Sequence, residues 1–373
     1  MVLGMLVAAL GPTLGALAEQ THSPLREISL LFIARSLGYM LGSIWVGSFY
    51  DRVRGNLLLS WGLVSSGLMV TLTPFIDNLW ALILLFLLQG MTGSIVNVGG
   101  NTLLVWANRE RLGPLLNGLH FIWGVGASLS PILMAQTMIR SGGITVGYIF
   151  LACLTLPVFF WLVRLPSPEN MHQEERDPED DAPLSLVILI GAFLFLYTGV
   201  EAGMGSWIYT FALGTNLMQA AEAAYLNSAF WGTLTLGRLA IIPLATRLRP
   251  RVILLMALSG ALASVSILLL AGQSRGWIWV GVAGLGFSFA SIFPTTLSFA
   301  ERRMNLSGKL TGRFFACSSG GAMVLPWLIG QFYESRGPRV LLWAVWGGVF
   351  LAGIIFYFMI GFPRKNEVKA QAH

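Results

Sequence analysis

The chain has 373 residues, of which 55% are hydrophobic and only 11% are charged, and its mean hydropathy is +0.72. A soluble domain usually carries about a quarter charged residues, so this composition excludes an ordinary soluble enzyme, a disordered chain and a disulfide scaffold. The net charge is +6, which we attribute to membrane topology rather than to a nucleic-acid partner, because Lys and Arg gather on the cytoplasmic loops of membrane proteins.

Apolar segments long enough to cross a bilayer follow one another along the whole chain. A transmembrane helix needs about 20 residues, and the pattern predicts an all-α membrane protein with twelve such helices. We read the first segment as a retained span rather than a cleaved signal peptide, because no basic region precedes it. The predicted spans are 1–18, 27–50, 57–75, 79–106, 115–138, 144–163, 184–213, 222–246, 252–271, 277–299, 311–333 and 340–361.

A single long polar stretch, RLPSPENMHQEERDPEDDAP at 164–183, interrupts this series. It is acidic and poor in apolar residues, which is typical of a solvated linker. The prediction is therefore an N-terminal six-helix bundle over 1–163, a linker over 164–183, a C-terminal six-helix bundle over 184–361 and a tail over 362–373.

The basic residues give these spans an orientation. If the N-terminus is cytoplasmic, sixteen Lys and Arg residues fall on cytoplasmic segments and five on outside segments, while Arg35 and Arg238 lie within spans. This asymmetry predicts cytoplasmic termini, a cytoplasmic linker and a multi-pass protein of the plasma (inner) membrane.

The two halves also share a weak internal repeat. The segment LGSIWVGSFYDRVRGNLLL (41–59) aligns with LGRLAIIPLATRLRPRVILL (236–255), so that Gly42 matches Gly237 and Arg52 matches Arg247. Repeated six-helix units are typical of transporters with a binding site between two bundles. Two unrelated helix junctions with small and basic residues remain the alternative.

The loop GSFYDRVRGN (47–56) resembles the loop signature of the major facilitator superfamily, with Thr246 replacing the aspartate in the second half. The segments 9–43, 115–133, 197–213 and 291–301 resemble the sodium-dependent glucose transporter-like branch, which is related to the fucose permeases. The resemblance implies two six-helix halves, alternating access, a small-molecule solute and a monomer.

The same resemblance implies an inner gate, in which Asp51 holds the cytoplasmic face closed against the eleventh span near Arg313. A carboxylate at a helix N-terminus also gains from the helix dipole. Topology alone is the alternative for the arginines of this loop. The gating residues predicted in this way are Gly47, Asp51, Arg52, Arg54 and Arg313.

Glu201 is the one acidic residue of 17 that lies deep in a predicted span. A carboxylate there costs at least about 2.5 kcal/mol by insertion scales and marks a functional site by default. We predict that Glu201 couples transport to H⁺ or Na⁺ or contacts solute, with structural pairing to a buried arginine as the alternative. Arg35 and Arg238 are the candidate partners, and depth in the membrane favours Arg35.

Polar and aromatic residues at helical spacing give the predicted solute site. Amides both donate and accept hydrogen bonds, which suits a polyhydroxylated solute, although amides also bond between packed helices. The histidine could relay protons or simply pack, and the aromatic residues could stack on a sugar or fill the core. The predicted solute-binding residues are Gln89, Asn97, Asn101, His120, Tyr197, Glu201, Trp207, Asn227 and Trp231.

Taken together, the sequence predicts a secondary active transporter for a small neutral sugar or polyol, coupled to H⁺ or Na⁺ symport. A proton-coupled drug or metabolite exporter is the alternative, and a non-transporting receptor or scaffold is a third. We expect no enzymatic activity, no metal site and no cofactor beyond the coupling ion, since no catalytic, metal-ligand or GxxxxGK[ST] pattern is present.

Overall fold

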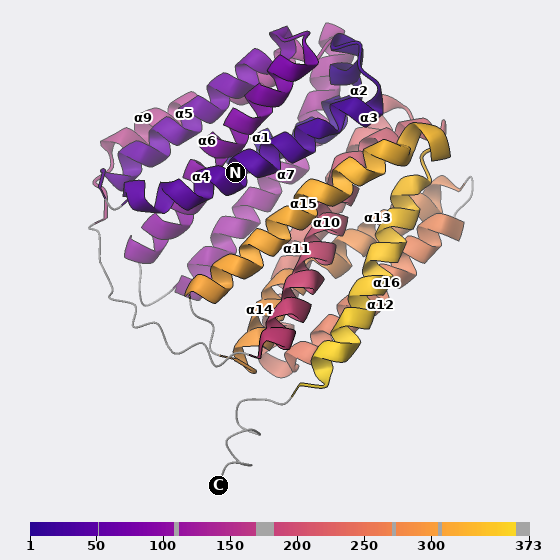
Figure 1. Cartoon of the computed structure of the whole chain (residues 1–373). Helices are drawn as coiled ribbons and strands as arrows, with labels where there is room; N and C mark the ends of the chain where they lie inside the picture. Colours follow the sequence, from indigo (N-terminus) through magenta and orange to yellow (C-terminus); the bar gives the residue numbers. More distant parts are fainter. Residues whose placement is uncertain (51, 108–111, 169–182, 271–273, 305–307, 363–373) are drawn as a thin grey trace.

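The computed structural model describes residues 1–50, 52–107, 112–168, 183–270, 274–304 and 308–362, and within these ranges the regular structure is helical (Figure 1). The helices are α1 (Val2–Ala8), α2 (Leu10–Gln20), α3 (Leu25–Ile28), α4 (Leu30–Tyr50), α5 (Gly55–Leu72), the 3₁₀ helix η1 (Thr73–Phe75), α6 (Leu79–Ala107), α7 (Leu112–Ser141), α8 (Thr145–Cys153), α9 (Thr155–Arg164), α10 (Leu184–Gly214), α11 (Ala220–Arg247), α12 (Pro250–Leu270), α13 (Arg275–Phe289), α14 (Ile292–Glu301), α15 (Gly308–Arg336) and α16 (Val340–Ile360).

By length and composition, ten helical segments among the described residues are able to cross a membrane, or eleven if the bent pair α1 and α2 counts as one span. The remaining predicted span, 311–333, corresponds to α15. This helix has 29 residues, but its sequence is rich in Gly, Ser and charged residues. It is therefore long enough to span, yet too polar to be recognised by hydropathy alone.

Four predicted spans are interrupted, and one of them, 27–50, is divided between α3 and α4 at Ser29. The first bends by 44° between α1 and α2, next to Pro12, which cannot donate a backbone hydrogen bond to Ala8. The segment 144–163 is divided between α8 and α9, and 277–299 between α13 and α14. A break inside a membrane helix frees backbone carbonyls, which then need other donors.

Close packing of small residues joins neighbouring helices. A Cβ added at Gly38 would lie 1.9 Å from the Leu87 carbonyl oxygen, and one at Gly90 would lie 2.0 Å from the Arg35 carbonyl oxygen. Only glycine permits this approach of α4 and α6. At Gly321 of α15 a Cβ would lie 1.8 Å from the Phe195 carbonyl oxygen of α10.

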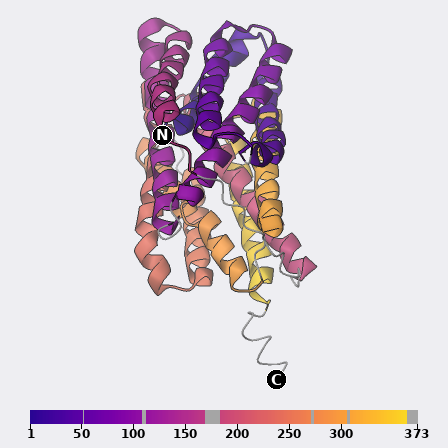
Figure 2. The same ribbon diagram turned by 90° about the vertical axis from the view of Figure 1, so that its left-hand side faces the viewer.

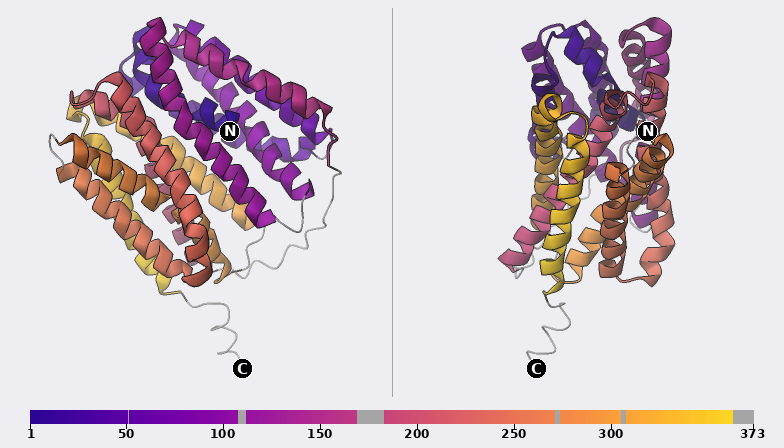
Figure 3. Two further views of the ribbon diagram at one scale, coloured as in Figure 1. Left: turned by 180° about the vertical axis from the view of Figure 1, so that it is seen from behind. Right: turned by 90° about the vertical axis from the view of Figure 1, so that its right-hand side faces the viewer.

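Two groups of helices lie side by side, one from α1 to α9 in indigo and magenta and one from α10 to α16 in pink to yellow (Figure 1). The same separation is visible from the other directions in Figure 2 and Figure 3. Helices also pack across the groups: α7 contacts α11, α2 contacts α10, and α15 contacts α3 and α4.

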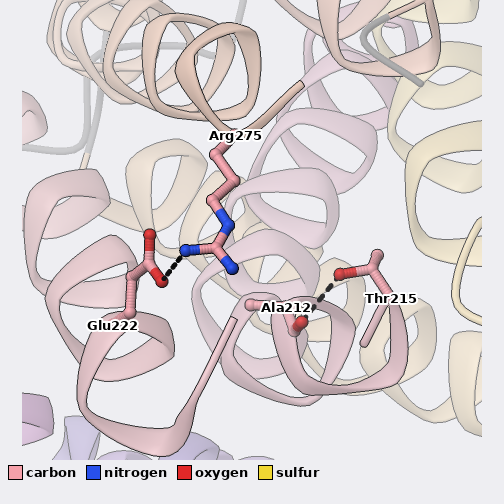
Figure 4. Close-up of polar contacts among 4 residues, drawn as sticks. All are labelled: Ala212, Thr215, Glu222 and Arg275. Atoms are coloured by element: carbon pink, nitrogen blue, oxygen red, sulfur yellow. Dashed lines mark hydrogen bonds and ion pairs between the residues drawn. The ribbon is translucent and has the colours of Figure 1, made fainter. Parts of the chain in front are cut away.

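The two ends of the molecule differ in charge, and we call them the basic end and the opposite end. The basic end is formed by the helix ends that carry Arg54, Arg164, Arg247 and Arg302. At the opposite end, Arg275 at the start of α13 pairs with Glu222 of α11 over 3.4 Å, near the end of α10 (Figure 4). The predicted linker and tail fall largely outside the described residues.

Candidate functional site

A cavity of about 1050 Å³ lies between the two groups of helices. Its wall is formed by α4, α6, α7, α10, α11, α12, α14 and α15. It reaches the basic end, because Pro250, Arg302 and Gly312 belong to its wall. A volume of this size matches a small-molecule site.

The wall contributed by α4 and α6 is polar and already ordered by hydrogen bonds. The Asn97 side-chain amide donates to the Tyr39 hydroxyl at 2.8 Å, and the Asn101 amide donates to the Asn97 carbonyl oxygen at 2.8 Å and to its side-chain oxygen at 3.2 Å. These residues line the cavity. The predicted amide stripe therefore faces the cavity over Asn97 and Asn101.

Glu201 of α10 also lines the cavity, one helical turn after Tyr197. The Tyr197 hydroxyl is hydrogen-bonded to the Glu201 carboxyl group, and it donates to the Phe289 carbonyl oxygen at 2.9 Å. Phe289 is the last residue of α13, where helix carbonyls lack an intrahelical donor. The hydroxyl thus connects the carboxyl group to the break between α13 and α14.

Arg238 of α11 lies in the same cavity and acts electrostatically on Glu201, Tyr197 and His120. No ion pair within 4.0 Å joins Arg238 to a carboxylate among the described residues. His120, an exposed residue of α7, faces Arg238 from the other group of helices. Glu201, Arg238 and His120, from three helices, therefore share the cavity with Arg302 at its basic end.

Arg35 is placed differently from the sequence expectation. Its guanidinium donates to the Val7 carbonyl oxygen at 2.9 Å, next to the bend between α1 and α2. It is not part of the cavity wall, whereas Arg238 is. The preference for Arg35 as the neighbour of Glu201 is thus corrected, because the Arg35 side chain contacts α1 whereas Arg238 faces the cavity.

Four other predicted solute-binding residues lie outside the cavity wall. Trp207 is fully buried, donates to the Pro326 carbonyl oxygen at 2.9 Å and stacks on Tyr333, so it packs the core. Gln89, Asn227 and Trp231 carry buried polar atoms with no hydrogen-bond partner among the described residues. They belong to helix interfaces in this conformation.

Contacts across the two groups close the opposite end. Gln331 of α15 accepts a hydrogen bond from the Arg26 guanidinium at 3.0 Å and donates to the Arg26 carbonyl oxygen at 3.0 Å. Glu334 accepts from the Leu25 backbone N–H at 2.7 Å. Since the cavity reaches the basic end, the described residues leave it open there and close it at the opposite end.

The predicted gate lies at the basic end. Gly47 belongs to α4, Arg52 and Arg54 are exposed before α5, and Arg313 is an exposed residue of α15. Asp51 lies outside the described residues, so its contact with the eleventh span stays a prediction.

Sequence reasoning missed the contribution of α14 and of the end of α13. Phe293 of α14 lines the cavity, and its ring centroid lies 5.4 Å from that of Phe315 of α15. Arg302, which directly follows α14, belongs to the cavity wall at the basic end. The signal was Pro294, which marks an interruption of the helix. Interpreted in this way, it would have indicated unpaired backbone carbonyls just before it, near the end of α13.

Relatives of this chain include proteins that are named as transporters. A sodium-dependent glucose transporter 1 of Xenopus laevis is 28% identical over 98% of this chain and 81% of the relative. The sodium-dependent glucose transporter 1A of Mus musculus is 29% identical, and the match covers 98% of this chain and 96% of the relative. A human major facilitator superfamily domain-containing protein 4A is 26% identical, and the match covers 97% of this chain and 90% of the relative.

The fold matches a solved transporter. A crystal structure of a mutant of the nucleoside transporter NupG superposes with a TM-score of 0.77 at 12% identity, covering 96% of each chain. The family model of the Major Facilitator Superfamily matches residues 1–326. This chain is therefore an integral membrane protein of the major facilitator superfamily, a family of secondary transporters rather than enzymes.

Proposed function

We propose that the protein moves a small polyhydroxylated solute of the sugar or polyol class by alternating access, with H⁺ or Na⁺ coupled through Glu201. The observation that carries the proposal is the placement of Glu201 in the central cavity, hydrogen-bonded to Tyr197. A carboxyl group at membrane depth can bind and release a cation only if water reaches it, and the cavity provides that access.

The solute class rests on the wall formed by α4 and α6. Tyr39, Asn97 and Asn101 present hydroxyl and amide groups, which both donate and accept hydrogen bonds as a sugar requires. The relatives named sodium-dependent glucose transporters support the same class.

The conformation follows from the orientation. If the basic end is cytoplasmic, as the distribution of Lys and Arg favours, the cavity is open to the cytoplasm and the structure is an inward-open state. We propose that the units 1–163 and 184–361 rock about the central site in a monomer, and that Gly47, Asp51, Arg52, Arg54 and Arg313 close the cytoplasmic side in the other state.

Reconstituted protein tests this proposal. Labelled hexoses and polyols are offered to proteoliposomes with an inward H⁺ gradient, an inward Na⁺ gradient or neither, and protein-free liposomes are the control. We expect gradient-driven accumulation of at least one solute. Efflux against a proton gradient would favour an exporter. Absence of uptake, efflux and any solute-induced thermal shift would contradict transport of this class.

A further inference from the structure

We propose that the transported solute carries one anionic group, that Arg238 and His120 bind this group, and that Glu201 is protonated when they do so. The solute is then a sugar acid, a polyhydroxylated monocarboxylate, rather than a neutral sugar. This inference rests on the proposed function and deepens it, because it names the substrate class and ties the coupling ion to the charge of the solute.

The first support is the state of Arg238. Its guanidinium lies in the wall of the cavity, half-buried, and makes no hydrogen bond or ion pair with any described residue. A guanidinium offers five donors in a planar fork that matches a carboxylate. A cation held at membrane depth is expensive without a counter-charge. The fork is therefore available to a ligand, and when Glu201 is protonated the missing counter-charge favours an anion.

The second support is His120, which stands near Arg238 but on another helix. The two side chains interact electrostatically, and both line the cavity. A histidine ring can donate a hydrogen bond in its neutral or its charged form. Because α7 and α11 belong to different groups of helices, a carboxylate held by both side chains would link the two groups.

The third support is the hydroxyl of Tyr197. It has one proton, yet it lies within hydrogen-bond distance of both the Glu201 carboxyl group and the Phe289 carbonyl oxygen. Tyr197 can give its one proton to only one of these acceptors at a time, whereas a protonated Glu201 could itself donate to the Tyr197 oxygen and leave the Tyr197 proton for Phe289. An ionised Glu201 would compete with Phe289 for the same proton.

The charges of Glu201, Arg238 and the solute are linked to one another. In the described part of the chain, the ionisable groups that act on Glu201 are Tyr197 of its own helix and Arg238 of α11, while His120 of α7 acts on Arg238. Protonation of Glu201 leaves Arg238 as a cation without a counter-charge. One proton and one monocarboxylate therefore complete the site together. A neutral sugar would leave Arg238 unpaired beside a protonated Glu201.

The rest of the wall argues for a hydroxylated acid. Asn97, Asn101 and Thr198 line the cavity, and the Thr198 hydroxyl is buried without a hydrogen-bond partner in the described ranges. Such a group is costly unless a ligand or water satisfies it. A compound with several hydroxyl groups beside its carboxylate provides these partners.

The test compares labelled glucuronate with labelled glucose in proteoliposomes and on a capacitive membrane sensor. We expect glucuronate uptake driven by a proton gradient without net current, because one positive and one negative charge enter together. Arg238→Gln should weaken glucuronate binding about 10- to 100-fold, the range expected for loss of a hydrogen-bonded charge, and Arg238→Lys should recover part of it. Arg247→Gln, on the same helix but outside the cavity wall, is the matched control and should bind like the wild type.

The outcomes separate this inference from the proposed function. Gradient-driven glucose uptake with no glucuronate binding would overturn the inference and leave the proposed function standing. Glucuronate binding that is unchanged in both Arg238→Gln and His120→Gln would also overturn it. Transport of neither compound, nor of any sugar or polyol, would contradict the proposed function itself. Size-exclusion profiles of each variant confirm that a loss of binding is not a loss of folding.

Discussion

The Tyr197 hydroxyl donates to the Phe289 carbonyl oxygen at 2.9 Å, and this bond ties α10 to the break between α13 and α14. The same hydroxyl contacts Glu201. A helix break in one span is thus connected, through one side chain, to the single carboxyl group in the cavity wall of the described residues.

Removal of that hydroxyl tests the connection. In Tyr197→Phe the ring and its edge contact with Phe289 remain, while two hydrogen bonds are lost. We expect about 1 kcal/mol lower stability and at least tenfold slower gradient-driven uptake, with solute binding within twofold of the wild type. Tyr357→Phe, at an exposed position, is the control. Uptake at the wild-type rate by Tyr197→Phe would show that the hydrogen bonds of the Tyr197 hydroxyl only support the fold.

Glu201→Gln replaces the carboxyl group by a neutral group of the same size. Because an amide neither binds nor releases a proton in this range, we expect no concentrative uptake, whereas exchange of internal for external solute continues. Both are measured in the same proteoliposomes. Glu222→Gln, which breaks the exposed ion pair with Arg275, should retain accumulation, since such pairs contribute little. Accumulation by the Glu201 variant would refute the coupling role.

Gly90→Ala should loosen the contact of α4 and α6. The added methyl group would lie 2.0 Å from the Arg35 carbonyl oxygen, and neither backbone can move without separating the helices. Overpacking of this kind costs about 1–3 kcal/mol, seen as a lower thermal unfolding temperature in detergent. Gly100→Ala lies on the same helix, and its Cβ would meet no described atom within 4 Å. It should be as stable as the wild type or slightly more stable.

Gln331→Ala removes the paired hydrogen bonds to Arg26 that hold the opposite end closed. We expect the population open at that end to increase several-fold, measured as faster maleimide labelling of a cysteine introduced by Asn227→Cys in a background lacking Cys153 and Cys317. Ser335→Ala is the control, because the Ser335 hydroxyl donates to Phe332 of its own helix. Equal labelling rates of Gln331→Ala and Ser335→Ala would show that other contacts hold the opposite end closed.

Asn227→Leu addresses a buried amide whose two polar atoms have no partner among the described residues in this conformation. An apolar side chain of similar size removes that cost, so thermal stability should stay the same or rise by about 1 kcal/mol. If the amide contacts solute when the opposite end opens, uptake should nevertheless fall. Reduced stability together with normal uptake would contradict both expectations.

The fold was largely predictable from sequence because its signals are local. A run of about 20 apolar residues identifies a span wherever it occurs, and the short motifs that carry the family resemblance are likewise local stretches of sequence. The polar helix α15 shows where hydropathy alone is insufficient. The sequence predicts it as one more apolar run, 311–333, although α15 as a whole is more polar than the other spans.

The candidate site was predictable in part. Asn97, Asn101, His120, Tyr197, Glu201 and Arg238 all line the cavity. Trp207, Asn227 and Trp231 share the same residue types and helical spacing, but they are buried between helices. Residue type and period give the face of a helix; they do not say which neighbour covers that face.

The sequence alone determined that this is a helical membrane protein with one carboxyl group at depth in a span, because hydrophobicity and charge are properties of each segment by itself. Only the tertiary structure decided which arginine shares the cavity with that carboxyl group. Arg35 and Arg238 are alike in sequence terms, yet packing turns Arg35 to the Val7 carbonyl and Arg238 into the cavity. The rotation of each helix against its neighbours depends on residues far apart in the chain, and so does the end at which the cavity opens.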